Sequence, residues 1–182
     1  MKTLIALLLL ALPLTAGAQD WKVDPAHSTL GFTGSFQGET FHGTFKTFDA
    51  KISFDPAHLE QARFDVTVQL ASVDTKSPER NQTLTGPDFF DTASDSTAHF
   101  TTKSFDKTAG GIVAHGMLDL NGMKQPVTLK VDFKRNGDHA TLDVDTTLNR
   151  LNFKLGTGSD WSAISKQIPV HGHLEMTSLP AH

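Results

Sequence analysis

The chain has 182 residues, with 16 Lys and Arg against 20 Asp and Glu, a formal net charge of −4 and no cysteine. Its mild acidity and singly scattered cations exclude the basic surface that binds nucleic acid or an anionic membrane face. Because there is no cysteine, the sequence also excludes disulfides, thiol catalysis and cysteine-based metal sites. The fold must therefore be held by its core.

The first 18 residues are typical of a secretory signal peptide. Lys2 gives a basic start, Leu4 to Leu14 is apolar, and Ala16-Gly17-Ala18 resembles a cleavage site. The apolar stretch is shorter than the roughly 20 residues that a membrane span needs. We therefore predict that residues 1–18 are a signal peptide, and that residues 19–182 form one domain in the periplasm.

The first third of the mature chain carries short alternating segments. Apolar residues recur with the spacing of half-buried strands at 30–36, 41–45 and 52–54, and strict alternation follows at 64–70. Turn signals at Gln37-Gly38 and Asp55-Pro56 separate these segments. This pattern predicts antiparallel strands with one buried face.

The segment 77–90, SPERNQTLTGPDFF, breaks the alternation. Ser77 suits a helix N-cap and Pro78 suits the first helical turn. We predict a short helix here, the only one in the mature chain.

Alternation returns at 112–120, 127–133, 142–148 and 168–176, and residues 156–166 read as a long loop around Trp161. About eight or nine short strands with one short helix predict an all-β fold. The choice lies between a sandwich and a single antiparallel β-barrel, which can hold a small ligand.

Small residues lie in the middle of several inward faces, at Gly34, Ala114, Gly116 and Gly172. They favour a barrel with room in its lumen, although the same glycines could mark bulges or bends. In such a barrel, Val127, Leu129 and the apolar residues that alternate after them would face the lumen.

Six phrases resemble the YceI-like family of exported, lipocalin-like polyisoprenoid-binding proteins, in the family's order and over nearly all of the mature chain. They are WKVDPAHSTLGF (21–32), GTFKTFDAKISFDP (43–56), SVDTKSPERNQTLTGPDFFD (72–91), HFTTKSF (99–105), GMLDLNGMKQPVTL (116–129) and LNRLNFKLGTGSDW (148–161). The resemblance implies a lipocalin-like barrel of about eight strands with an elongated hydrophobic lumen that holds a long isoprenoid or acyl chain.

The last phrase is most similar to the branch whose members occur beside b-type membrane cytochromes. That similarity implies an isoprenoid quinone as ligand and a b-type membrane cytochrome as partner. The resemblance to the family as a whole implies a homodimer. Many members also carry a histidine after the first strand, where this chain has Gln37, with His42 several residues later.

Fifteen residues are candidates to contact the ligand, most of them on predicted inward faces. The chain has 13 Phe and no Tyr, and phenylalanine suits either a lipid tunnel or a dry core. The candidates are Phe32, Phe36, Phe45, Phe54, Phe64, Val66, Arg80, Asn81, Ala114, Gly116, Leu118, Leu129, Val131, Leu148 and Trp161.

Two arginines could donate to a quinone carbonyl or a phosphate at a tunnel mouth, Arg80 in the helical segment and Arg150. The favoured alternative for such a guanidinium is a structural salt bridge with Asp74 or Asp88. Trp161 either closes the tunnel or packs its own loop.

His171 and His173 share one strand face and could chelate a metal with His115 as third ligand, but that face is predicted to be solvated. Asp24 and His27 could form an acid-base pair, but a turn is the favoured interpretation. With no Gly-x-Ser-x-Gly elbow and no cysteine, nothing indicates nucleophilic catalysis. We therefore predict no metal, no catalytic residue and no cofactor other than the bound lipid.

These observations predict a periplasmic, non-enzymatic carrier of an isoprenoid quinone or a polyprenyl lipid. The first alternative is an enzyme that acts on such a lipid or on a small apolar substrate. The second is a structural or stress-response module with a solid core and a partner-binding surface.

Overall fold

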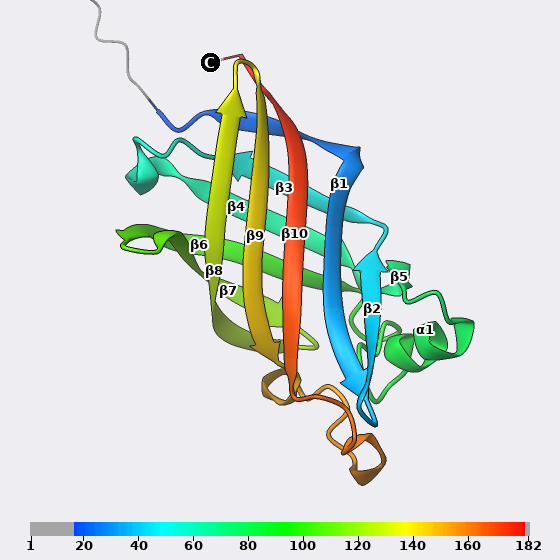
Figure 1. Cartoon of the computed structure of the whole chain (residues 1–182). Helices are drawn as coiled ribbons and strands as arrows, with labels where there is room; N and C mark the ends of the chain where they lie inside the picture. The colour runs from blue at the N-terminus through cyan, green and yellow to red at the C-terminus, as the bar shows by residue number, and fades with distance from the viewer. Residues whose placement is uncertain (1–16, 181–182) are drawn as a thin grey trace, which may run out of the picture.

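The structure is a computed structural model that describes residues 17–180, and within them an antiparallel sheet closes into a barrel (Figure 1). The predicted signal peptide lies outside this range except for its last two residues. The strands are β1 (Asp20–Phe36), β2 (Glu39–Phe45), β3 (Phe48–Ser53), β4 (Arg63–Gln69), β5 (Val73–Asp74), β6 (Thr97–Thr108), β7 (Gly111–Leu120), β8 (Met123–Asn136), β9 (His139–Asn149) and β10 (Gln167–Ser178). Helix α1 is Pro78–Thr85, and the 3-10 turns are η1 (Leu59–Gln61), η2 (Leu70–Ser72), η3 (Arg150–Phe153) and η4 (Ser159–Trp161).

Eight strands form the closed wall, in the order β1, β3, β4, β6, β7, β8, β9, β10 and back to β1. β1 pairs with β10 from Trp21↔Ser178 to Phe32↔Val170, but with β3 only at Asp20↔Ser53 and Trp21↔Ile52. The predicted single antiparallel barrel of about eight strands is confirmed.

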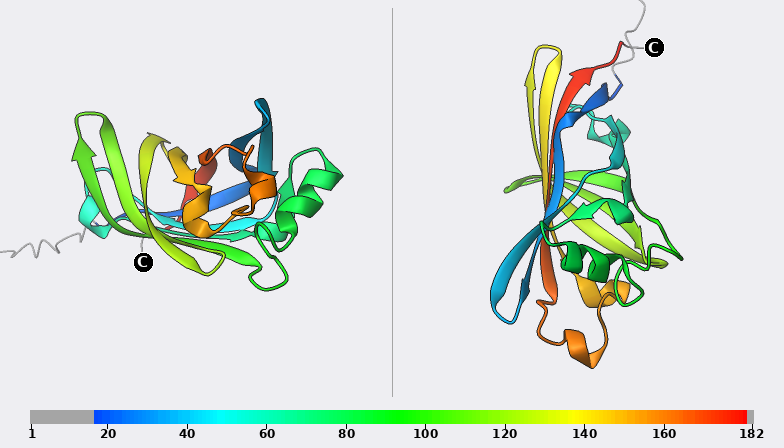
Figure 2. Two further views of the ribbon diagram at one scale, coloured as in Figure 1. Left: turned by 90° about the horizontal axis from the view of Figure 1, so that it is seen from below. Right: turned by 90° about the vertical axis from the view of Figure 1, so that its right-hand side faces the viewer.

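β2 departs from this wall. It pairs with β1 from Gly31↔Thr44 to Phe36↔Glu39, whereas β5 covers its other edge only at Thr44 and Phe45. Figure 2 shows the β1–β2 hairpin leaning outward at the end of the molecule that carries α1. The outer edge of β2 from Glu39 to Gly43 thus has no strand partner among the described residues.

Helix α1 begins as predicted. The Ser77 side chain accepts a hydrogen bond from the Arg80 backbone N–H, and Pro78 occupies the first turn. Its inward side contributes Leu84, which is buried. No helix within residues 17–180 is long and apolar enough to cross a membrane.

The interior divides into two clusters at opposite ends of the barrel. The closed half is the cluster at the end that carries the chain termini, formed by Trp21, Ile52, Phe54, Ala62, Phe64, Phe100, Phe105, Ala114, Val127, Val131, Ala140, Leu142, Leu174 and Met176. The hollow half is the cluster at the end that carries α1, formed by Val68, Leu70, Val73, Leu84, Phe89, Phe90, Ala98, Leu120, Phe153 and Leu155. Residues of β4, β6 and β7 contribute to both halves.

The alternating apolar residues of β8 face inward, as predicted. Val127 and Val131 are buried, Leu129 and Phe133 are half-buried, and the residues between them are exposed. Val127 and Leu129 border a cavity, whereas Val131 does not, and Val127 and Val131 both pack in the closed half.

Candidate functional site

The hollow half contains a cavity of about 230 Å³. It is larger than the cavity of about 150 Å³ that holds benzene in another protein. All of its lining residues are apolar except Thr146 and Arg150. The lining comprises Leu30, Phe32, Phe41, Phe45, Val66, Val68, Leu70, Leu84, Phe89, Phe90, Ala98, Phe100, Leu118, Leu120, Val127, Leu129, Val144, Thr146, Leu148, Arg150, Phe153, Leu155, Ile164, Ile168 and Val170.

Part of this lining was predicted from the alternation. Six candidate ligand residues border the cavity, namely Phe32, Phe45, Val66, Leu118, Leu129 and Leu148. Phe41 also lines the cavity but was not among the candidates, although it alternates with Phe45. Phe89 and Phe90 were not among them either, because they follow the helical segment and carry no periodic signal.

Five other candidates lie away from the cavity, so the structure does not bring them together with the first six. Phe54, Phe64, Ala114 and Val131 pack in the closed half, and Phe36 is 40% exposed on the β1–β2 hairpin. Alternation indicates which side of a strand faces inward. It does not indicate how far along the barrel axis a residue lies, and the cavity occupies only one half of that axis.

The inward glycines do not create empty space directly, which corrects the expectation that small inward residues leave room in the lumen. A Cβ added to Gly116 would lie 2.5 Å from the Phe100 ring and 2.5 Å from the Thr101 carbonyl oxygen. A Cβ on Gly34 would likewise lie 2.5 Å from the Phe41 ring.

Three cavity-lining phenylalanines therefore share one arrangement, in which the ring lies over a glycine of the neighbouring strand. The pairs are Phe41 over Gly34, Phe32 over Gly43 and Phe100 over Gly116. Because each ring occupies the space of a missing side chain, it lies along the wall and leaves the lumen open.

The end of the cavity is closed by the loop that follows β9, and Arg150 organises this loop. Nε donates to Ser165 O at 3.1 Å. The two terminal nitrogens donate to four more carbonyl oxygens, those of Leu155, Gly156, Trp161 and Ile164. The side chain is 5% exposed, and burial lowers the pKa of its guanidinium from the ordinary value. All five N–H donors of Arg150 thus bond to the backbone, and none is free for a ligand.

Trp161 and Asn81 are held by neighbouring protein groups. Trp161 Nε1 donates to Asp88 Oδ2 at 3.1 Å, and its ring lies edge-on to Phe89, 5.0 Å between centroids. Asn81 Oδ1 accepts from the Thr75 backbone N–H at 2.8 Å and from the Thr75 hydroxyl at 2.7 Å. Trp161 packs the loop against a cavity-lining ring, whereas Asn81 fixes α1 to the end of β5.

Arg80 does not make the salt bridge favoured from the sequence. Its guanidinium carbon lies 4.6 Å from the centroid of the Phe41 ring, and Nη1 donates to Thr75 O at 3.4 Å. Asp74 instead pairs with Lys46 and Lys76.

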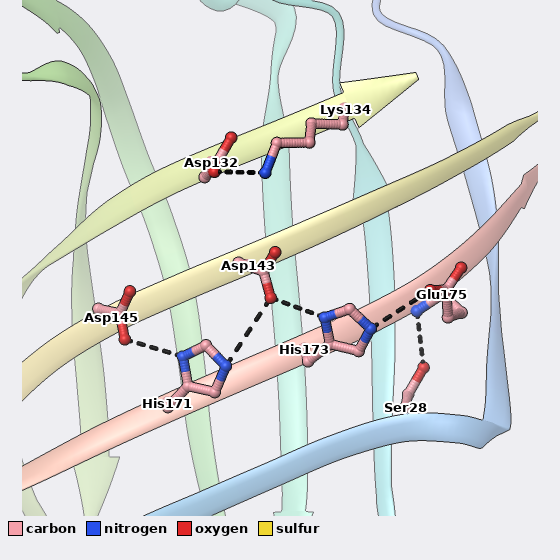
Figure 3. A network of polar contacts seen from close by, with 8 residues as sticks. All are labelled: Ser28, Asp132, Lys134, Asp143, Asp145, His171, His173 and Glu175. Carbon is pink, nitrogen blue, oxygen red and sulfur yellow. Dashed lines mark hydrogen bonds and ion pairs between the residues drawn. The ribbon is translucent and has the colours of Figure 1, made fainter. Parts of the chain in front are cut away.

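The outer face of β9 and β10 carries a chain of alternating acids and histidines (Figure 3). Asp145 contacts His171 Nδ1 at 2.8 Å, and Asp143 lies between His171 at 3.7 Å and His173 Nδ1 at 2.6 Å. His173 Nε2 continues to Glu175 at 3.3 Å. The hydrogen bond to Asp143 raises the pKa of His173 above its ordinary value.

Carboxylates lie beside His171 and His173. The described residues contain no group of three or more His, Asp or Glu arranged to hold a metal ion. That the protein needs no metal stays a prediction. His27 and Asp24 form an exposed contact of 2.8 Å, in which Asp24 also accepts from the Ala26 backbone N–H, as in the expected turn.

Comparisons with known proteins agree with this architecture. The family model of the YceI-like domain matches residues 21–176. Protein YceI of Escherichia coli O17:K52:H18 is 35% identical over 143 residues, 75% of each chain. A UPF0312 protein of Vibrio campbellii is 30% identical over 173 residues, 90% of this chain and 92% of the relative.

Two solved structures are similar over most of their length. Burkholderia cenocepacia BcnA superposes with a TM-score of 0.79 and 30% identity, covering 85% of this chain and 99% of the other. A polyisoprenoid binding domain from Saccharophagus degradans gives a TM-score of 0.70 over 87% of this chain and 98% of its own, but its 19% identity supports the fold alone. From the span of the family match and the identity to its relatives, this chain belongs to the YceI-like domain family.

Proposed function

We propose that the protein binds and carries a long-chain isoprenoid lipid, with the hydrocarbon tail in the cavity of the hollow half. The observation that supports this most is the apolar lining of that cavity, in which the arginine donors are already bonded to carbonyls. A site of this kind favours hydrocarbon and offers little to a polar group. The resemblance of the sequence to the YceI-like family implies the same class of ligand, and the polyisoprenoid binding domain of Saccharophagus degradans shares the fold.

The energetics of burial fit an isoprenoid tail. Each buried methylene contributes roughly 0.8 kcal/mol, so a five-carbon isoprene unit contributes up to about 4 kcal/mol. A cavity of about 150 Å³ holds the six carbons of benzene. In proportion, the cavity of about 230 Å³ holds roughly nine carbons, or about two isoprene units. A longer tail would have to displace lining side chains or continue past the rim.

We further propose that binding takes place after export, in the periplasm. The support is the signal-like sequence of residues 1–18 together with the start of the folded part. Gln19 O accepts from the Phe54 backbone N–H, and β1 begins at Asp20. Cleavage after Ala18 would therefore leave these contacts intact. The b-type membrane cytochrome and the homodimer stay predictions from the resemblance.

Binding without catalysis is the better interpretation of the cavity. An enzyme needs convergent polar groups beside the reacting atoms. Among the described lining residues only Thr146 and Arg150 are polar, and Arg150 is fully bonded. A solid-core module is disfavoured because the hollow half is not filled by side chains.

The test is to purify the protein from its producing cell under mild conditions, measure it by native mass spectrometry, and then extract it with organic solvent. We expect a mass increment that disappears on extraction and is recovered as an isoprenoid lipid. A protein that carries no lipid, and that also fails to bind added farnesol, geranylgeraniol or a short-chain quinone, would contradict the proposal.

A further inference from the structure

Arg80 lies at the rim of the cavity, in contact with one of the lining rings. Its guanidinium stacks on Phe41, a residue of β2 whose ring lines the cavity and packs over Gly34. The outer edge of β2 at Phe41 has no strand partner among the described residues. The contact between α1 and β2 at this point is therefore made by side chains alone.

The guanidinium of Arg80 has unused donors. A guanidinium carries five N–H groups. Within residues 17–180 this one makes a single long hydrogen bond, to Thr75 O at 3.4 Å, and no ion pair. Two acidic groups that could have paired with it are occupied, Asp74 by two lysines and Asp88 by Trp161.

Two lysines lie near the segment that Arg80 contacts. Lys46 and Lys76 both contact Asp74, at 2.9 and 2.8 Å, and Thr75, which follows Asp74, accepts the bond from Arg80. Glu79 on the first turn of α1 is the other acidic residue beside Arg80 in the chain. Arg80 therefore lies beside two lysines that share one carboxylate, Asp74.

The cavity and the rim are chemically complementary. The interior offers no free donor at Arg150, so a polar head group has to stay outside the apolar lining. A guanidinium binds planar or tetrahedral oxyanions through two parallel N–H bonds, and more strongly than it binds a neutral carbonyl. We infer that Arg80 binds an anionic oxygen head group, so that the ligand is a hydrocarbon chain ending in a phosphate or a carboxylate. This inference rests on the proposed function and adds the head-group class to it.

Ligands that have the same hydrocarbon tail but different head groups distinguish binding of the tail in the cavity from binding of the head group by Arg80. Farnesyl phosphate and farnesoate carry the two anionic head groups, and farnesol carries a neutral one. Their affinities are measured for the full chain and for Arg80→Gln, Arg80→Lys and Arg135→Gln, with inorganic phosphate alone as a further probe. Arg135 is the matched control, since its guanidinium carbon lies 5.3 Å above the Trp21 ring, in the closed half.

We expect one or both anionic ligands to bind about tenfold to hundredfold more tightly than farnesol, the range for a hydrogen bond to a charged group. Arg80→Gln should abolish this preference and leave the affinity for farnesol within about twofold. Arg80→Lys should retain part of it, because the charge remains but the paired N–H geometry is lost. Arg135→Gln should leave it unchanged.

The ratio of affinities within one protein sample is the deciding readout, since partial unfolding lowers both affinities together. If farnesol and the anionic ligands bind equally to the unmodified protein, or if both Arg80 variants keep the full preference, the head-group inference is wrong while the cavity function stands. Inorganic phosphate binding as tightly as farnesyl phosphate would overturn the inference in favour of an ion site unrelated to the cavity. If none of the farnesyl ligands binds, the proposed function itself fails.

Discussion

The closed and hollow halves of the barrel are built by the same strands but use their aromatic residues in opposite ways. In the closed half, the rings of Phe54, Phe64, Phe105 and Phe133 contact one another across the lumen, with centroids 4.9 to 5.6 Å apart. Around the cavity, Phe32, Phe41 and Phe100 each lie over a neighbouring glycine and along the wall, and Phe100 also packs against the closed half. Whether a phenylalanine fills or frees the lumen thus depends on the size of the residue beside it on the next strand.

The two halves also differ in how their ends are held. In the closed half, Trp21 Nε1 donates to Phe54 O at 2.9 Å, so an indole ties β1 to the end of β3. In the hollow half the cap is a loop gathered around the Arg150 guanidinium. The end of the hollow half is therefore held by the hydrogen bonds of a buried cation, whereas the end of the closed half is held by a packed aromatic residue.

The largest expected effect comes from removing that cation. Arg150→Met keeps much of the apolar stem but leaves several carbonyl oxygens without a donor, at about 1–3 kcal/mol for each group that stays buried. We expect the free energy of unfolding to fall by about 3 kcal/mol or more, and tail binding to be lost. Denaturant melts measure the first and farnesol titration the second, with the exposed Arg63→Met as control. A loss below about 1 kcal/mol would contradict the organising role of Arg150.

A pair of substitutions on one strand tests the comparison itself. Leu142 and Leu148 both face inward on β9, but Leu142 packs in the closed half at 1% exposure and Leu148 lines the cavity. Leu142→Phe should overpack the core and cost about 1–3 kcal/mol. Leu148→Phe has space to occupy, so it should cost less and reduce the affinity for farnesol. Equal costs and equal affinities would show that the halves do not differ.

The sequence predicted the wall of the barrel better than its interior. Strict alternation in segments such as 127–133 identified the inward faces, and Ser77 with Pro78 located the start of α1, because both signals are local. The division into two halves was not predictable, since the orientation of Phe100 depends on Gly116 of another strand. The role of Arg150 was equally hidden, because its partners are backbone carbonyls that no residue type reveals.

The smallest expected effect concerns the outer face of β9 and β10. His173 has a raised pKa in the folded protein because Asp143 accepts its Nδ1–H, with Glu175 adding to the effect. The protonated contact therefore stabilises the fold below the unfolded pKa of about 6.5, and this contribution is lost as the pH rises through the higher folded pKa.

Removing His173 should expose this pH dependence. The difference in unfolding free energy between the unmodified protein and His173→Gln should stay below about 1 kcal/mol, because the pair is partly solvated. It should be largest at acidic pH and decline above about pH 6.5. The exposed His139→Gln is the control. A difference that grows with rising pH would contradict the assignment.

The location of the tail can be tested most directly with the two tryptophans of the chain, one in each half. Trp21 lies in the closed half, and Trp161 packs on Phe89 at the cavity. The variants Trp21→Phe and Trp161→Phe each leave a single fluorophore, and titration with a terminally brominated hydrocarbon chain, a short-range quencher, reports which half the chain enters. The account predicts strong quenching of Trp161 and little of Trp21. Quenching of Trp21 as strong as that of Trp161 would contradict it.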